Sequence, residues 1–219
     1  MPVFRLSDEI VFPPPELSEE DGLLAVGGDL SSDRLLAAYS MGIFPWYSDD
    51  SPILWWSPDP RLVLMPDDLK VSRSLKQTIR KGIYSVTFDA DFEGVMRNCA
   101  SAPRKDEAGT WITEDMIEAY CRLHEEGHAH SVEVWNCNEL AGGLYGVSLG
   151  RAFFGESMFS LKSDASKVAL VAFVSRLKEN GYLFLDCQVK TGHLESMGAR
   201  EIARKEFLKL LKKALSLPV

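Results

Sequence analysis

The spacing of apolar residues divides most of the chain after residue 61 into helices and strands. Apolar residues three or four positions apart share one face of a helix. They predict helices over residues 71–82, 113–127, 164–181 and 206–215. Shorter apolar runs, alternating or continuous, predict strands over residues 84–90, 130–136, 139–150, 151–160 and 182–189. Because a helix connects the last two strands and the second of these strands is predicted to be buried on both faces, we expect a right-handed crossover in a mixed sheet.

Residues 1–61 differ from the rest in composition. They hold eight of the eleven prolines and three of the five tryptophans. One helix is predicted here, with Ser31 or Ser32 as its N-cap and Gly42 at its end, and the remainder is turn and extended chain. The sequence therefore predicts an α+β fold, with a small irregular N-terminal domain over residues 1–61 and a mixed-sheet domain over residues 62–219.

Length and composition limit the class of protein. The chain has 219 residues, 46% hydrophobic and 26% charged, which is enough apolar material to bury a core. No apolar run approaches the roughly 20 residues of a membrane span, and no signal-peptide pattern is visible. Four cysteines without a CxxC pair indicate thiols in a reducing compartment. We therefore expect a cytoplasmic protein without a membrane partner.

Two polar residues interrupt the very apolar strand YLFLDCQV, residues 182–189. In a regular strand Asp186 and Gln188 share one face, about 7 Å apart, while Leu185 and Cys187 face the other way. A carboxylate in this position loses hydration and needs compensation. Asp186 either caps a helix or pairs with an arginine in the core, or it belongs to an active site where more polar groups converge.

Glu156 is a second isolated acid, in the otherwise uncharged stretch FFGESMFS. Gly155 beside it permits close backbone approach. A buried glutamate should find a cation, for which Lys162 or Lys167 would serve, or its pKa should shift. Two acids and an amide on neighbouring strands suit a positively charged amine, which must lose a proton before it attacks.

Aromatic residues in loop-like settings are candidates for nucleobase stacking. Trp46 follows Phe44 and a proline and is the better candidate, whereas Trp55 and Trp56 are more typical of a hydrophobic plug. Trp111 precedes a predicted helix start, again in a loop-like setting.

A formal net charge of −8 argues against a general nucleic-acid coat but leaves room for a local basic face. Arg73, Lys76 and Arg80 share a face of the helix predicted over residues 71–82, and Lys81 is adjacent. This face is either the solvated side of an amphipathic helix or a surface that binds phosphates.

Three histidines, His124, His128 and His130, invite a metal-site interpretation. Gly127 ends the helix between the first two, so the i, i+4 geometry of a zinc-binding helix is lost. We therefore expect no metal.

Nine strings, in colinear order from about Phe12 to Phe207, together resemble leucyl/phenylalanyl-tRNA–protein transferases. They are GLLAVGGDLS, GIFPWYSDDSPILWWSPDPR, GTWITEDMIEAY, LHEEGHAHSVEVW, GGLYGVSLG, FFGESMFS, DASKVAL, DCQV and HLESMGAREI. The resemblance implies transfer of leucine or phenylalanine from its tRNA to the free α-amine of proteins that begin with arginine or lysine. It implies a second domain with the GNAT-type fold of the acetyl-CoA-dependent N-acetyltransferases, and products that enter N-end-rule degradation. We expect no cofactor and a monomer.

The resemblance also implies roles for individual residues. The Asp-x-Gln pair assigned to the chemistry corresponds to Asp186 and Gln188, and the glutamate assigned to the acceptor region corresponds to Glu156. The apolar donor pocket maps onto Leu144, Phe153, Leu170, Phe173 and Leu185. The aromatic residues that hold the terminal adenosine match Trp46 and Trp111, with Tyr39 and Tyr120 nearby. Phosphate contact becomes the expected role of Arg73, Lys76, Arg80 and Lys81.

These roles suggest a mechanism. Gln188 would accept a hydrogen bond from the amine, and Asp186 would polarise Gln188 or take the proton through it. Glu156 would meet the cationic first side chain of the acceptor. Donors branched at Cβ should fit poorly, whereas methionine should serve as a weak donor.

Two other functions compete with this one. An acyl-CoA N-acyltransferase on the same fold would need a Gln/Arg-x-x-Gly-x-Gly/Ala loop before a helix, and no such loop precedes DASKVAL. A non-catalytic binder of tRNA ends or protein N-termini could keep the aromatic residues and the basic face. Such a module has less need of an Asp-x-Gln pair beside Glu156.

Overall fold

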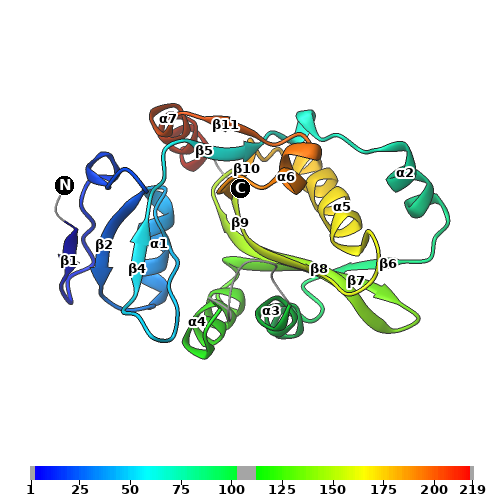
Figure 1. The fold of residues 1–219 in the computed structure, drawn as a ribbon, viewed down its shortest axis with the longest axis horizontal. Coiled ribbons are helices and arrows are strands. Elements are labelled where there is room, and N and C mark those ends of the chain that lie inside the picture. The colour runs from blue at the N-terminus through cyan, green and yellow to red at the C-terminus, as the bar shows by residue number, and fades with distance from the viewer. Residues whose placement is uncertain (1–2, 103–111, 218–219) are drawn as a thin grey trace.

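The structure, a computed structural model, describes residues 3–102 and 112–217. Two sheets organise these residues, one built by the N-terminal segment and a larger one built by the rest (Figure 1). The elements in chain order are β1 (Phe4–Leu6), η1 (Pro15–Leu17), β2 (Leu23–Gly27), α1 (Ser32–Ser40), β3 (Phe44–Pro45), β4 (Leu54–Trp56), β5 (Arg61–Leu64), η2 (Pro66–Asp68), α2 (Arg73–Arg80), β6 (Ser85–Phe88), α3 (Phe92–Ser101), α4 (Glu114–Glu125), β7 (Ala129–Asn136), β8 (Glu139–Leu149), β9 (Ala152–Ser160), α5 (Ala165–Glu179), β10 (Phe184–Gln188), α6 (Gly192–Ser196), β11 (Arg200–Ile202) and α7 (Arg204–Leu215).

The N-terminal segment folds into a small sheet with one helix beside it. Its strand order is β1-β2-β4-β3, and α1 is the helix expected from the sequence. Trp55 is completely buried, with its ring centroid 4.9 Å from that of Phe12, so the plug interpretation is confirmed for this tryptophan. The sequence pattern does not reveal the sheet, because strands of two to five residues are too short to display an alternation.

The larger sheet has the strand order β11-β5-β10-β9-β8-β7-β6. β9 and β10 are parallel neighbours, and α5 connects them along the chain. The other strand pairs of this sheet are antiparallel. The predicted α+β class with a mixed sheet is therefore confirmed.

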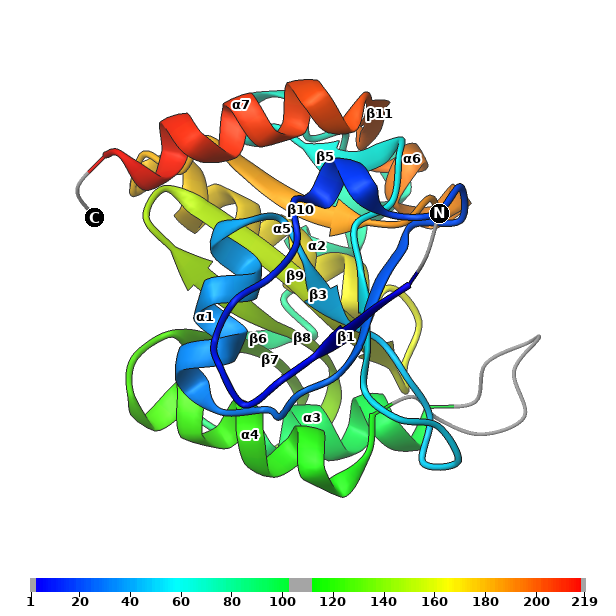
Figure 2. The same cartoon turned by 90° about the vertical axis from the view of Figure 1, so that its left-hand side faces the viewer.

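Helices cover both faces of the larger sheet. α5 lies on one face, and α3 and α4 lie on the other (Figure 1). Viewed toward the N-terminal sheet, α7 lies above α1 while α3 and α4 lie below it (Figure 2). α1 contacts both α4 and α7, so one hydrophobic core extends from the N-terminal segment into the second sheet. Within the described ranges, no helix is both long and apolar enough to cross a bilayer.

Candidate active site

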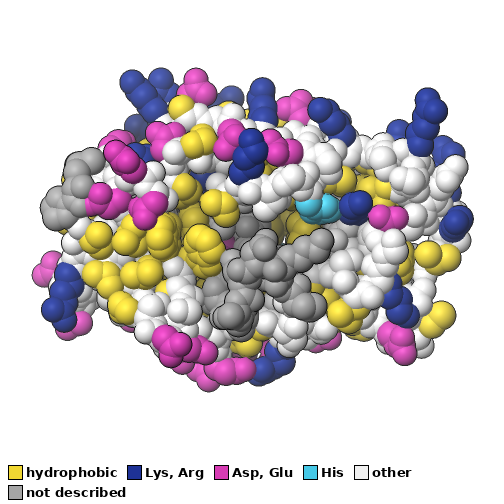
Figure 3. Space-filling view, in the orientation of Figure 1, with side chains coloured by type: hydrophobic (Ala, Val, Ile, Leu, Met, Phe, Trp, Pro, Cys, Tyr) yellow, Lys and Arg dark blue, Asp and Glu magenta, His cyan; other side chains and the backbone are white. Residues whose placement is uncertain are grey.

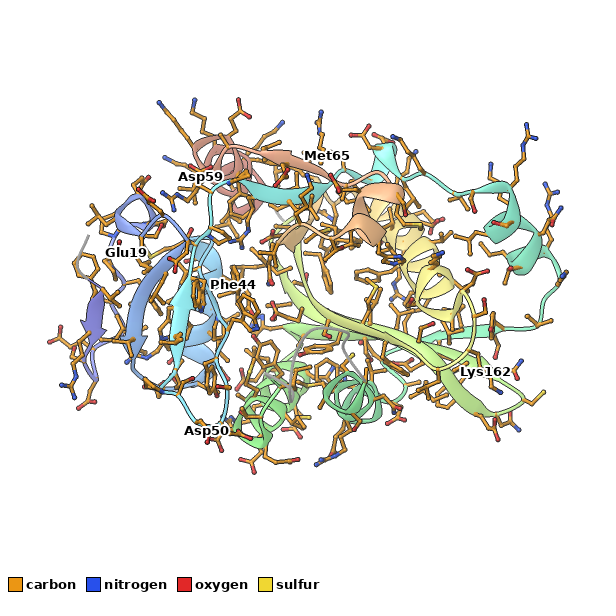
Figure 4. All side chains as sticks on the ribbon, viewed as in Figure 1. Glu19, Phe44, Asp50, Asp59, Met65 and Lys162 are labelled. Atoms are coloured by element: carbon orange, nitrogen blue, oxygen red, sulfur yellow. The ribbon has the colours of Figure 1, made fainter. Side chains whose placement is uncertain are left out.

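A cavity of about 530 Å³ opens between the N-terminal sheet and strands β8, β9 and β10. Phe44 on β3, labelled in Figure 4, lies on the side of the small sheet that faces the larger one. The cavity is lined by Phe44, Pro45, Trp46, Leu144, Tyr145, Gly155, Glu156, Ser157, Met158, Leu170, Leu185, Cys187, Gln188, Val189, Lys190, Thr191, His193 and Leu194. Most of these side chains are apolar, and the polar ones come from β9, from the end of β10 and from the segment that follows β10 into α6.

A bulge in β10 decides which side chains face this cavity. Leu185, Cys187 and Gln188 line it, and Asp186 is not among the lining residues. The pairing of β10 with β5 shifts register between Asp186 and Gln188, and Gln188 has a left-handed backbone with φ of 61°. The prediction that Asp186 and Gln188 share one face is therefore wrong, because an extra residue in the strand breaks the alternation.

Glu156 and Gln188 form a hydrogen-bonded pair at the wall of the cavity. Gln188 Nε2 donates to Glu156 Oε1 at 2.8 Å. Two tyrosine hydroxyls donate to the same carboxylate, Tyr39 to Oε1 at 2.8 Å and Tyr120 to Oε2 at 3.4 Å. The two hydroxyls also lie within hydrogen-bonding distance of each other, and because each carries one proton, two of these three contacts are filled at a time. Because Tyr39 comes from α1 and Tyr120 from α4, both halves of the molecule hold this carboxylate.

Burial changes the acidity of Glu156. Its side chain is only 8% exposed, and burial raises its pKa to about 7, although its hydrogen bonds act in the opposite direction. Lys162 and Lys167 pair with other acids, Glu139 and Asp164. The expected pKa shift is therefore confirmed, whereas a lysine partner for Glu156 is not found among the described residues.

Asp186 pairs with an arginine of the core, one of the alternatives left open by the sequence. Arg61 Nε donates to Asp186 Oδ1 at 2.9 Å, and Arg61 Nη2 donates to Oδ2 at 2.7 Å. Asp186 Oδ1 also accepts a hydrogen bond from the backbone N–H of Gln188 at 2.9 Å. Asp186 is thus connected to Gln188 through the backbone, while the side-chain amide of Gln188 bonds to Glu156.

The predicted donor pocket separates into two layers. Leu144, Leu170 and Leu185 line the cavity. Phe153 and Phe173 are not among the lining residues, so their part in the donor pocket stays a prediction. Their rings contact each other, with centroids 4.4 Å apart, in the hydrophobic cluster that also contains the three leucines. They lie behind the lining because both belong to the fully packed layer between β9 and α5.

The aromatic residues expected to hold adenosine do not all lie at the cavity. Trp46 lines the cavity, and its backbone oxygen accepts a hydrogen bond from Trp56 Nε1. Trp111 lies outside the described residues. Tyr39 and Tyr120 are completely buried, so neither ring has a face open to a nucleobase, and their predicted adenosine contact is corrected. Their hydroxyls instead hold Glu156.

The basic helix predicted from the sequence is α2, which lies at the edge of the molecule away from the N-terminal sheet (Figure 1). Its cap is Ser72, whose hydroxyl accepts a hydrogen bond from the Leu75 N–H. Arg73, Lys76, Arg80 and Lys81 are all exposed. In Figure 3, lysine and arginine side chains stand along the upper edge of this view of the molecule. Phosphate contact stays a prediction.

The histidines have local hydrogen bonds. His130 Nδ1 lies 3.0 Å from Asp89 Oδ2, and His124 Nδ1 lies 2.8 Å from the backbone oxygen of Ala129. Across residues 3–102 and 112–217, no group of three or more His, Cys, Asp or Glu side chains is arranged to hold a metal ion.

Sequence reasoning missed Arg61 and His193. Arg61 is a charged residue at the start of the apolar run RLVL, and this oddity could have matched it with the isolated Asp186. His193 lines the cavity, and its Nε2 is buried without a hydrogen-bond partner among the described residues. Nothing in the pattern around His193 signals this position.

Comparison with known proteins identifies the family. The family model described as leucyl/phenylalanyl-tRNA protein transferase matches residues 63–212, and the model for the N-terminal domain of the same family matches residues 28–59. The chain belongs to the leucyl/phenylalanyl-tRNA protein transferase family. It is therefore an aminoacyltransferase, as the resemblance implied.

Individual members of the transferase family are similar over almost the entire chain. A leucyl/phenylalanyl-tRNA–protein transferase of Syntrophobacter fumaroxidans is 62% identical over 211 residues, which cover 96% of this chain and 90% of the relative. Another, of Anaeromyxobacter sp. (strain Fw109-5), is 60% identical over 218 residues, which cover 100% of this chain and 93% of the relative.

Solved structures with a similar arrangement of elements include acetyltransferases. An aminoglycoside acetyltransferase from an uncultured soil metagenomic sample has 12% identity and a TM-score of 0.39, covering 51% of this chain and 80% of that chain. A ribosomal-protein-alanine N-acetyltransferase from Brucella melitensis biovar Abortus has 11% identity and a TM-score of 0.37, covering 52% of this chain and 84% of that chain.

Proposed function

We propose that this chain transfers leucine or phenylalanine from its tRNA to the free α-amine of proteins that begin with arginine or lysine. The product carries a new peptide bond and a new N-terminal residue, and it feeds N-end-rule degradation in the cytoplasm. The observation that carries the proposal is the hydrogen-bonded pair of Glu156 and Gln188 at the wall of an apolar cavity. We expect the enzyme to act as a monomer without a cofactor.

The apolar lining supports leucine and phenylalanine as donors. Leu144, Met158, Leu170 and Leu185 offer a surface without charges to a large side chain. Burying such a side chain is favourable by roughly 1.5–3 kcal/mol. Valine and isoleucine branch at Cβ and should fit less well, whereas methionine is unbranched and should be a weak donor.

The orientation of Gln188 supports a role in holding the acceptor amine. Since Gln188 Nε2 donates to Glu156, its Oε1 lies on the opposite side of the amide, where it can accept a hydrogen bond from the amine. The aminoacyl ester is already activated, so holding the amine in line with the ester carbon can supply up to about 7–11 kcal/mol of the acceleration.

We assign Glu156 to the proton of the amine. The acceptor amine has a pKa of about 7.7–8 and must be neutral to attack. In the reaction the neutral nitrogen bonds to the ester carbon and gives up one further proton. The bond from that carbon to the tRNA oxygen breaks, this oxygen takes up a proton, and the tRNA leaves as an alcohol. A carboxylate with a pKa of about 7 is suited to accept the ammonium proton. Glu156 Oε1 already accepts two hydrogen bonds at 2.8 Å, whereas Oε2 accepts only a long one, at 3.4 Å, from Tyr120, so Oε2 has capacity left for the proton of the amine. A guanidinium that binds both oxygens would have to displace the donors on Oε1, which argues against contact with the acceptor's first side chain.

The tRNA would meet the protein at two places. Trp46 at the cavity is the proposed stacking surface for the terminal adenosine, together with Trp111. The exposed basic face of α2 is the proposed contact for phosphates farther along the tRNA.

A transfer assay tests the proposal. The protein is mixed with radiolabelled leucyl-tRNA and with otherwise identical acceptor proteins that begin with arginine, lysine or alanine. We expect label in the first two acceptors and little in the third. Label in none of them, with leucyl-tRNA still bound, would favour a non-catalytic binder. Transfer of a labelled acyl group from acyl-CoA instead would favour the acyl-CoA N-acyltransferase function.

A further inference from the structure

Arg61 occupies an unusual position for a cation. It is the first residue of β5, and its side chain is only 1% exposed. Its guanidinium makes two parallel hydrogen bonds with Asp186, at 2.9 and 2.7 Å, and lies 4.7 Å from the centroid of the Phe44 ring and 4.7 Å from that of Phe207. Two aromatic faces and a carboxylate therefore fix this guanidinium on three sides.

The surroundings of Arg61 connect distant parts of the chain. Phe44 lies on β3 of the N-terminal sheet and lines the cavity. Phe207 lies on α7 and contacts Phe184 of β10. Arg61 thus lies where the small sheet, the last helix and the strand that carries Gln188 meet.

Asp186 links Arg61 to Gln188 by hydrogen bonds. Both oxygens of its carboxylate bond to the guanidinium, and Oδ1 also accepts the backbone N–H of Gln188. That N–H belongs to the bulge, where Gln188 has a left-handed backbone that costs energy for a residue other than glycine. The fixed carboxylate compensates for this cost and keeps the bulge in the form that directs Gln188 toward Glu156.

We infer that Arg61 is a positioning residue for the transfer reaction: through Asp186 it holds the β10 bulge that aims the Gln188 amide into the cavity. The inference rests on the proposed function and deepens it. Asp186 then orients rather than accepts protons, because Arg61 binds both of its oxygens and its side chain is not among those that line the cavity. Neither residue touches the substrates.

Arg61→Lys tests the inference, because lysine keeps the charge but cannot make two parallel hydrogen bonds. With saturating leucyl-tRNA and acceptor, we expect kcat to fall about tenfold or more, since small misplacements of reacting groups are costly. The affinity for leucyl-tRNA should change less than about twofold, because a misplaced reacting group slows the transfer step more than it weakens binding. Arg34→Lys is the matched control. Arg34 is equally buried, but its guanidinium donates to backbone oxygens of residues 7–9 in the N-terminal segment and not to Asp186. We therefore expect kcat to be unchanged.

Asp186→Asn and the double variant separate positioning from simple stabilisation. Asp186→Asn should lower kcat by a similar factor while the inflection of kcat with pH stays where it is in the wild-type protein. Adding Arg61→Lys to Asp186→Asn should lower kcat less than about twofold further, because both changes act on one contact. Should Arg61→Lys fail to fold, as judged by thermal unfolding, the Asp186→Asn pH profile alone decides.

The outcomes are distinct. A wild-type protein that transfers nothing refutes the proposed function. If the wild-type protein transfers leucine and the Arg61→Lys variant is fully active, the inference about Arg61 is refuted and the proposed function is not. The inference also fails if the two changes multiply, or if Asp186→Asn removes the pH inflection, because Asp186 would then be the base.

Discussion

At the scale of single residues, Glu156 is the group whose environment departs most from that of an ordinary acid. It is buried beside an apolar cavity, and two tyrosine hydroxyls and one amide satisfy its oxygens. These hydrogen bonds replace the hydration that the carboxylate loses on burial, so it needs no paired cation. Its charge can therefore act on a substrate amine. The same burial makes Glu156 a source of pH-dependent stability.

The stability of the protein should record the raised pKa of Glu156. The pKa rises from 4.5 to about 7 on folding, so between these values the folded protein binds a proton that the unfolded chain has lost. The contribution of this group is complete below pH 4.5 and disappears as the pH rises through 7. Relative to Glu156→Gln, the wild-type free energy of unfolding should fall by on the order of 3 kcal/mol between pH 4 and pH 8.

Urea unfolding of the two proteins across this pH range measures the difference. Glu139→Gln, at a side chain that is 75% exposed, is the control for the substitution itself. Parallel curves for wild type and Glu156→Gln would mean that burial does not perturb this carboxyl.

Leu144 should influence donor choice, because its side chain lines the cavity. Leu144→Phe adds volume to the wall, so it should exclude the larger donor more than the smaller one. We expect the ratio of kcat/KM for leucyl-tRNA to that for phenylalanyl-tRNA to rise about tenfold or more. Leu161→Phe, at a residue that is 59% exposed, is the control and should leave the ratio unchanged. An unaltered ratio in Leu144→Phe would place donor binding elsewhere.

At the scale of elements, α2 is the candidate for contact with the tRNA body. Its basic side chains are exposed, and within the described residues they have no assigned acidic partner. Replacing Arg73, Lys76 and Arg80 by alanine should weaken leucyl-tRNA binding and reduce the slope of log K against log salt by about 2 to 3. The matching removal of Lys205, Lys209 and Lys212 from α7 should leave the slope close to wild type. Equal slopes for the α2 variant and the wild type would exclude this helix.

The strength of the sequence signal differs from element to element. α4 and α5 were readable from their apolar period, caps and stops, and β7 to β10 from their apolar runs. α3 is not among the predicted helices, although Phe92, Val95, Met96 and Cys99 recur at helical spacing after the cap Asp91, because glycine and asparagine lower the helix propensity of this short segment. The bulge in β10 has no sequence signal, since nothing in DCQV indicates an inserted residue. The prediction that Asp186 and Gln188 share one face was wrong for this reason.

The candidate site was only partly predictable for the same physical reason. Isolated polar residues in apolar strands pointed to Glu156 and Gln188 directly. Tyr39, the partner of Glu156, and Arg61, the partner of Asp186, come from segments more than a hundred residues away, so only the tertiary structure reveals them. The exclusion of Phe153 and Phe173 from the cavity wall likewise depends on packing depth, which periodicity does not report.

At the scale of the whole molecule, the site belongs to neither sheet alone. The N-terminal segment contributes Tyr39, Phe44 and Trp46, and the larger sheet contributes Glu156 and Gln188. The continuous core joins the two parts, and Tyr39 on α1 donates directly to Glu156 on β9, so a change at Tyr39 should alter the chemistry at Glu156.

Tyr39→Phe tests this coupling, because it removes one donor to Glu156 from the other half of the molecule. The lost hydrogen bond favoured the ionised form, so the pKa of Glu156 should rise further and the pH at which kcat is half-maximal should increase by about one unit. Tyr84→Phe, whose hydroxyl donates to the Ser163 backbone, is the control. A pH profile of Tyr39→Phe that overlays the wild type would separate α1 from catalysis.

The most direct test of the account is the single-turnover rate of leucine transfer by Gln188→Ala, with leucyl-tRNA and an arginine-initiated acceptor both saturating. The central claim is that the amide at this position holds the attacking amine in line with the ester. We expect a rate about a hundredfold or more below wild type with leucyl-tRNA affinity retained. A rate near that of the wild type would contradict it.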